Sequence, residues 1–149
     1  MEYKIFEVTE AKEEYAVAIR NLLPQLSSSQ HTFTLDTLQS LVANDCTKLF
    51  LLQTKENIVG MLTLCSSLSP TGRKMWIEDV VVDASQRGHS LGRTLVEHAI
   101  EYVRTNRPEA TLMLTSRPSR VAANALYRSA GFTPKETNVY SMKFDEQKK

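Results

Sequence analysis

A chain of 149 residues, 42% of them hydrophobic and 23% charged, has the size and composition of one soluble globular domain. We expect that domain to span residues 1–149, with an ordered core of about residues 3–144. The formal net charge of +1 and the lack of a Lys/Arg cluster argue against a nucleic-acid partner, and the apolar runs are too short to cross a membrane. Two isolated cysteines, Cys46 and Cys65, argue against a disulfide framework or a zinc site. No signal-peptide pattern follows Met1, so we expect a cytoplasmic protein.

Hydrophobic periodicity and turn residues divide the chain into alternating strands and helices. In chain order we expect a strand at 3–8, a helix from 9 or 10 to about 24, a polar loop at 25–34, a short helix from about 35 to 42, strands at 48–54 and 58–65, a loop at 66–74, a strand at 76–83, a helix from about 91 to 106, a strand at 111–115, a helix from about 120 to 130, and a closing pair of strands at 132 and 139–144. This order predicts an α/β chain of the α+β type, with helices on both faces of one sheet.

The centre of the chain combines a buried strand, a glycine-marked turn and an amphipathic helix. An apolar β-branched run, Val80-Val81-Val82, ends the strand, and Arg87 and Arg93 flank the turn that follows. Because the first N–H groups of a helix are unpaired and lie at its positive end, this turn suits a phosphate group. The apolar stripe of the helix consists of Leu91, Leu95, Val96, Ala99, Ile100 and Val103.

Two motifs in this order resemble those of the Gcn5-related N-acetyltransferases (GNAT). The family signature Arg/Gln-x-x-Gly-x-Gly/Ala is matched by Arg87-Gly88-His89-Ser90-Leu91-Gly92. A second hallmark is matched by Asn124-Ala125-Leu126-Tyr127 followed by Gly131-Phe132. The resemblance implies the GNAT fold, a mixed, mostly antiparallel sheet of six or seven strands whose fourth and fifth strands splay apart.

The resemblance further implies that acetyl-CoA is the acetyl donor. Its pyrophosphate would rest on backbone N–H groups between Gly88 and Arg93, and its pantetheine arm would pair with the strand backbone around Val80 and Val82. The cofactor-binding residues implied in this way are Val80, Val81, Val82, Arg87, Gly88, His89, Ser90, Leu91, Gly92, Arg93 and Asn124.

Ser90 departs from the family signature, which has glycine at this position. Serine keeps the backbone N–H that a pyrophosphate would use. In a backbone conformation of positive φ it would cost on the order of 1 kcal/mol that glycine avoids. We expect Ser90 to have ordinary helical geometry.

Acetyl transfer from a thioester to an amine needs a base for the amine and a proton donor for the departing thiolate. By the resemblance, Tyr127 matches the residue that donates a proton to the CoA thiolate in the family. Alternatively, Tyr127 is only a core residue of its helix. Glu78 is the candidate base, because a carboxylate within an apolar strand is costly unless it faces a cleft or a partner. Strand alternation directs Asp79 to the opposite face unless a bulge intervenes. Both carboxylates could instead bind a cationic substrate or pair with arginines.

The remaining polar residues form no metal-ligand spacing, so we expect no metal site. Arg117 and Arg120 follow the strand at 111–115 and could contact an acidic substrate, a phosphate of CoA or only solvent. The loop at 25–34, with Gln30, His31 and Phe33, occupies the position at which the family shapes its acceptor pocket.

The sequence therefore predicts an acetyl-CoA-dependent N-acetyltransferase that acts on a primary amine of a small molecule. A CoA-binding sensor with the same fold is the alternative, and an amino-sugar phosphate or a protein amine is an alternative acceptor. A dinucleotide-binding Rossmann domain is excluded, because its G-x-G-x-x-G motif is absent. A homodimer is compatible with the family, and the sequence has no exposed stripe that decides it.

Overall fold

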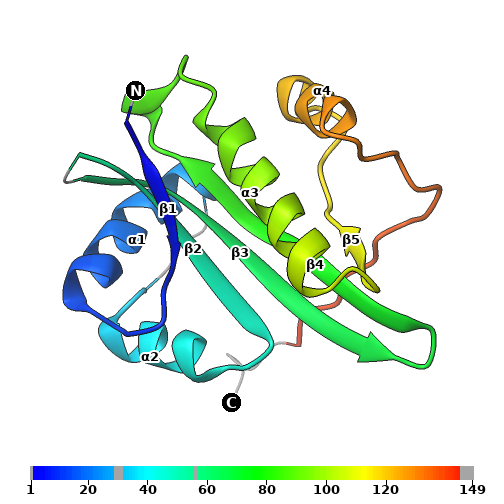
Figure 1. Cartoon of the computed structure of the whole chain (residues 1–149), viewed down its shortest axis with the longest axis horizontal. Helices are drawn as coiled ribbons and strands as arrows, with labels where there is room; N and C mark the ends of the chain where they lie inside the picture. The colour runs from blue at the N-terminus through cyan, green and yellow to red at the C-terminus, as the bar shows by residue number, and fades with distance from the viewer. Residues whose placement is uncertain (1, 29–31, 56, 145–149) are drawn as a thin grey trace.

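A mixed sheet in the order β1-β2-β3-β4-β5 forms the centre of the molecule in the computed structural model, which describes residues 2–28, 32–55 and 57–144 (Figure 1). The strands β1 to β4 pair antiparallel, and β5 pairs parallel with β4. The elements are β1 (Lys4–Glu7), α1 (Glu13–Leu26), α2 (Leu35–Ala43), β2 (Thr47–Thr54), β3 (Asn57–Ser69), β4 (Gly72–Val82), the 3-10 turn η1 (Ala84–Gln86), α3 (Leu91–Asn106), β5 (Thr111–Met113) and α4 (Val121–Ser129). The predicted α/β class is confirmed.

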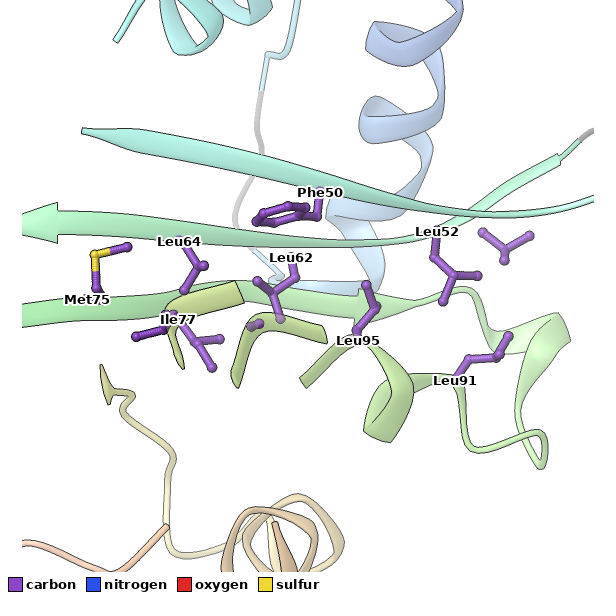
Figure 2. Packing of buried hydrophobic residues seen from close by; sticks show 11 residues of the cluster. Phe50, Leu52, Leu62, Leu64, Met75, Ile77, Leu91 and Leu95 are labelled. Carbon is purple, nitrogen blue, oxygen red and sulfur yellow. The ribbon is translucent and has the colours of Figure 1, made fainter. Parts of the chain in front are cut away.

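Helices cover both faces of the sheet, as the sequence predicts. The helices α1 and α2 pack on one face, α3 packs on the other, and α4 lies beside α3 beyond the edge of β4 (Figure 1). On the α3 face, alternate strand residues such as Phe50, Leu62 and Ile77 meet Leu91 and Leu95 (Figure 2). On the other face, Leu49, Leu51 and Met61 meet the buried stripes of α1 and α2. Two separate cores result, one on each face of β2, β3 and β4.

The apolar stripe predicted for α3 forms as expected. Five of its six residues, Leu91, Leu95, Val96, Ala99 and Val103, are buried. Gly60 of β3 lies under this helix, where a Cβ atom would come within 3.2 Å of the Leu95 side chain. The close approach fixes the amino-terminal half of α3 against the sheet.

The predicted loop at 66–74 is wrong, because β3 and β4 continue through it as a long hairpin. Ser69 pairs with Gly72 at its tip, and Gly72 has φ +117°. Only glycine adopts such a backbone angle without strain, so Gly72 allows the tight turn after Pro70.

The predicted closing strands at 132 and 139–144 are also wrong. Residues 132–144 form no strand. Within the described part of the chain the sheet therefore has five strands, whereas six or seven were predicted. A strand needs a partner edge, and β5 offers only three residues for pairing. The four large apolar side chains of this segment are 73–87% exposed: Val139, Tyr140, Met142 and Phe144.

Candidate functional site

A β-bulge interrupts β4 in the middle of the sheet. Thr63 of β3 pairs with Glu78, whereas Met61 pairs with Val81, so Leu62 alone lies opposite Asp79 and Val80 together. Asp79 has φ +53°, in the left-handed region that non-glycine residues seldom adopt. The bulge resets the alternation of side chains. Val81 therefore packs in the core of the α1 and α2 face.

The strands β4 and β5 separate just before the bulge. Their parallel pairing runs from Lys74 opposite Thr111 only to Trp76 opposite Met113. From Ile77 to Val82 the edge of β4 on the β5 side has no strand partner among the described residues. This edge presents backbone N–H and C=O groups that a ligand with amide groups can pair with, as an added strand would. The splaying predicted for these strands is confirmed.

A cleft of about 1240 Å³ opens along this free edge. Its walls come from the end of α1, the second half of β4, the start of α3, the β5–α4 connection and α4. The sequence-predicted residues that line it are Val80, Val81, Val82, Arg87, Gly92 and Tyr127. Further residues that line it are Gln25, Leu26, Ser27, Ser28, Asp79, Val96, Thr115, Ser116, Arg117, Ser119, Arg120, Ala123, Leu126 and Val139.

Glu78 and Asp79 lie on different sides of this site. Asp79 lines the cleft, and Glu78 lies on the α1 and α2 face beside Thr63. The pKa of Glu78 is raised, first by partial burial of its carboxyl group and second by the negative charge of Asp79. Neither carboxylate forms an ion pair with any described residue. Both remain available to a cationic group, and Glu78 holds a proton more readily than an ordinary glutamate.

Tyr127 lies in the wall of the cleft that α4 provides. Its ring packs edge-on against Phe132, with the ring centroids 6.1 Å apart. Among the residues that the structure describes, the Tyr127 hydroxyl has no hydrogen-bond partner. The ring is held by packing, and the hydroxyl is free to donate to a ligand.

Ser116 lines the same cleft, and sequence reasoning did not identify it. Its Oγ atom is buried and has no hydrogen-bond partner within the described part of the chain. A buried hydroxyl without a partner costs about 1–3 kcal/mol, which a ligand in the cleft could recover. Nothing in the local sequence distinguishes Ser116 from other serines of loops.

The turn between β4 and α3 contains two residues of positive φ, Gly88 and Ser90. Gly88 has φ +88°, and His89 is exposed. Ser90 has φ 59° and ψ 27°, so the expectation of ordinary helical geometry is wrong. The chain must reverse direction to begin α3 at Leu91, and this left-handed residue makes the reversal. Ser90 thus carries the strain that the glycine of the family pattern avoids.

We expect Ser90→Gly to stabilise the fold by about 0.5–1 kcal/mol, because glycine adopts φ 59° without steric cost. Urea denaturation of the two proteins measures the difference. Gly92→Ser is the matched control, since Gly92 has room for a Cβ atom and lies within α3. A Ser90→Gly variant less stable than the parent would contradict the strain assigned to Ser90.

Arg93 and Asn124 make structural contacts instead of lining the cleft. The Arg93 guanidinium donates to Ser129 Oγ and lies 3.7 Å from the Glu97 carboxylate, so it joins α3 to α4. Asn124 Nδ2 donates to the Arg117 carbonyl at 2.9 Å. That bond holds the β5–α4 connection against α4. The implied direct contacts of these two side chains with a cofactor remain predictions.

Gln25, in the last turn of α1, links this helix to the β4–α3 turn. Its Nε2 donates to Asp83 Oδ1 at 2.7 Å, and its Oε1 accepts from the Ala84 N–H at 2.8 Å. Hydrogen bonds from Ser85 and Gln25 lower the pKa of Asp83. The end of α1 and the β4–α3 turn are thereby joined, through residues 58 positions apart that no local pattern relates.

The predicted acceptor loop at 25–34 is described only in part. Gln30 and His31 lie outside the described residues, and Phe33 is buried in the core of α1 and α2. Within the described ranges, no three His, Cys, Asp or Glu side chains are grouped to hold a metal ion, and no helix is long and apolar enough to span a membrane.

The sequence profile of the Acetyltransferase (GNAT) family matches residues 12–132. Among curated proteins, no significant match to the chain was found. Solved structures with the same fold are numerous, and the three that follow are each less than 25% identical in sequence to this chain, so they bear on the fold alone.

Three of these structures span the same elements. An aminoglycoside acetyltransferase from an uncultured soil metagenomic sample, in complex with sisomicin, has a TM-score of 0.81 at 18% identity, covering 95% of both chains. The glucosamine-6-phosphate N-acetyltransferase of Arabidopsis thaliana has a TM-score of 0.79 at 20% identity, covering 97% of this chain and 100% of its own. The ribosomal-protein-alanine N-acetyltransferase of Brucella melitensis biovar Abortus 2308 has a TM-score of 0.75 at 16% identity, covering 96% and 99%.

Proposed function

Since the chain belongs to the Acetyltransferase (GNAT) family, we propose that it transfers the acetyl group of acetyl-CoA to a primary amine of a small molecule. The observation that carries the proposal is the free edge of β4 from Ile77 to Val82 along a cleft of about 1240 Å³. An extended ligand with amide groups can pair with that edge, and a sheet that continued from β4 into β5 would leave no room for it.

The residues around the cleft fit acetyl-CoA in chemical type. Backbone groups of Val80 and Val82 suit the two amides of the pantetheine arm. The turn that contains Gly88 ends at the amino terminus of α3, and Arg87 lines the cleft beside it, which suits a pyrophosphate. When bound, acetyl-CoA would supply a thioester carbonyl that an amine can attack.

Two residues of this chain would carry out the two proton transfers of the reaction. Glu78 would accept a proton from the amine, directly or through water, and its raised pKa brings it nearer to that task than an ordinary carboxylate. Tyr127 would donate its hydroxyl proton at the departing sulfur, since that hydroxyl has no other partner in the described chain and lines the cleft. Asp79, which lines the cleft, would attract a positively charged acceptor.

A small amine is the acceptor we propose, and a CoA-binding sensor without turnover is the alternative. Structural neighbours named for aminoglycosides and for glucosamine 6-phosphate support a search among small amines. The unpaired carboxylates Glu78 and Asp79 favour an acceptor that carries positive charge.

The test is a panel of amines with acetyl-CoA, in which release of the free thiol is measured. The panel should contain aminoglycosides, aliphatic diamines, amino sugars with and without phosphate, amino acids and a peptide amino terminus. Turnover of at least one amine that depends on Glu78 supports the proposal. Binding of acetyl-CoA by calorimetry, with no thiol release from any amine, would favour the sensor.

A further inference from the structure

Three arginines line the cleft; Arg87 interacts with the charge of the Asp83 carboxylate, whereas Arg117 and Arg120 have no acidic partner among the described residues. Arg87 comes from the β4–α3 turn, and Arg117 and Arg120 come from the connection between β5 and α4. None of the three forms an ion pair with a described residue, although arginines on the outer surface, such as Arg104 and Arg107, do so. Asp79 is the one acidic residue among the described residues that line the cleft. Three arginines against one carboxylate give the lining an excess of positive charge. The two guanidinium groups that lack a counter-charge, those of Arg117 and Arg120, favour an anionic ligand in the cleft.

The pair Arg117 and Arg120 is held in place by its own turn. The Arg120 N–H donates to the Arg117 carbonyl at 3.0 Å, and that same carbonyl accepts from Asn124 Nδ2 at 2.9 Å. Asn124 therefore anchors the turn to the first part of α4. The buried, unpartnered Oγ atom of Ser116 precedes the pair directly and lies in the same wall. Two guanidinium groups and an unsatisfied hydroxyl are thus presented on an ordered segment.

The direction of the chain relates this turn to the phosphate end of the proposed cofactor. The strand β5 is parallel to β4, so the connection that leaves it runs toward the edge at which β4 ends (Figure 1). The Arg93–Ser129 contact also fastens α4 to the first turn of α3. The pyrophosphate turn and the arginine pair consequently face one cleft from its two walls.

Coenzyme A carries a further anionic group beyond the pyrophosphate. This group is a phosphate monoester on the ribose 3′ oxygen, which is nearly a dianion at neutral pH. The turn with Arg87 suits the pyrophosphate, and Arg93 is engaged by Glu97 and Ser129. We propose that Arg117 and Arg120 form a second anion subsite that binds the ribose 3′-phosphate and selects coenzyme A over its dephosphorylated form. This inference rests on the proposed function.

The test compares the dissociation constants of coenzyme A and 3′-dephospho-coenzyme A by calorimetry. We expect the parent protein to bind coenzyme A about tenfold or more tightly, which is the scale of a charge-assisted contact. The double variant Arg117→Gln/Arg120→Gln should bind both ligands alike, at the affinity of the dephosphorylated form. The control Arg104→Gln/Arg128→Gln removes the same charge from residues outside the cleft lining and should keep the preference.

The outcomes separate the subsite from the function on which it rests. Equal affinities in the parent protein, or a preference that survives in the double variant, would overturn the subsite and leave the transferase proposal standing. Failure of the parent to bind either ligand would overturn both. A phosphate of the acceptor is the other source of an anion. If the double variant loses only a preference for glucosamine 6-phosphate over glucosamine, in thiol-release assays, the assignment to the ribose phosphate is overturned.

Discussion

Tyr127→Phe should lower kcat about 100-fold while leaving the affinity for acetyl-CoA within about twofold. The substitution keeps the ring and its edge-on contact with Phe132, and it removes only the hydroxyl that lines the cleft without a partner in the described chain. A proton donor acts when the thiolate departs, so its loss affects the transition state far more than binding. Steady-state thiol release and calorimetry measure the two effects separately.

The control for Tyr127 is Tyr140→Phe, because Tyr140 is 87% exposed and lies outside the cleft lining. It should leave kcat unchanged. Full activity of Tyr127→Phe would show that this tyrosine serves its helix only as a packing residue. A lower melting temperature with unchanged kcat would lead to the same conclusion, since the deletion of a free hydroxyl should not destabilise the fold.

Glu78→Gln should lower kcat/KM for the amine about 100-fold and remove the acid limb of its pH profile. The active form of the base is the carboxylate, so activity rises with pH through the pKa of Glu78. Burial and the charge of Asp79 both raise that pKa, and the limb should therefore lie above the ordinary value near 4.5. Measurement of kcat/KM from a pH below the ordinary value of 4.5 upward, with an amine whose own pKa is known, locates the limb.

Asp79→Asn is the partner experiment for the base. Asparagine tolerates the left-handed backbone of residue 79, and it removes the charge that is the second cause of the raised pKa. The acid limb should move to lower pH and remain above 4.5, because burial still acts on Glu78. A limb that does not move in this variant would mean that another group is being titrated.

Stability separates the loss of a base from the loss of the fold in Glu78→Gln. A carboxylic acid whose folded pKa is raised favours the fold below its unfolded pKa, and that benefit is lost as the pH rises through the folded pKa. Above the folded pKa of Glu78 the parent carries the desolvated charge, and the glutamine variant does not. Its melting temperature should therefore equal or exceed that of the parent, so that a loss of activity with a lower melting temperature would contradict the catalytic role.

Local patterns were sufficient to predict the elements and the parts of the site that are contiguous in sequence. The strand, turn and helix from Trp76 to Val103 obey periodicities that each residue shares with near neighbours. The turn at Gly88 and the stripe of α3 could be predicted for this reason. The hairpin tip at Gly72 was missed, because Pro70 and the serines before it resemble a loop and their pairing is set by the partner strand.

The missed features depend on contacts between distant residues. A bulge at Asp79 is a mismatch of register with β3, and nothing in Glu78-Asp79-Val80 alone requires it. The Gln25–Asp83 bond joins two turns that are adjacent only after the sheet and α1 have packed. Ser116 Oγ lacks a hydrogen-bond partner, and Arg117 and Arg120 lack an ion-pair partner, among the described residues. Only the folded structure can show that a partner is missing. The closing strands predicted at 132 and 139–144 do not form in the described residues, and β5 offers only three residues for pairing.

The bulge has a consequence for how this chain can vary. It is one extra residue, and every side chain of β4 beyond it faces the side that this extra residue dictates. Without Asp79, Val80 would pair with Leu62 and Val81 with Met61 in regular alternation, so each valine would keep its present face. A regular strand that retained Asp79 would instead turn Val81 toward α3, and Val80 and Val82 toward α1. We expect the middle of β4 to accept the loss of residue 79 more readily than the gain of a further residue between Val80 and Val82.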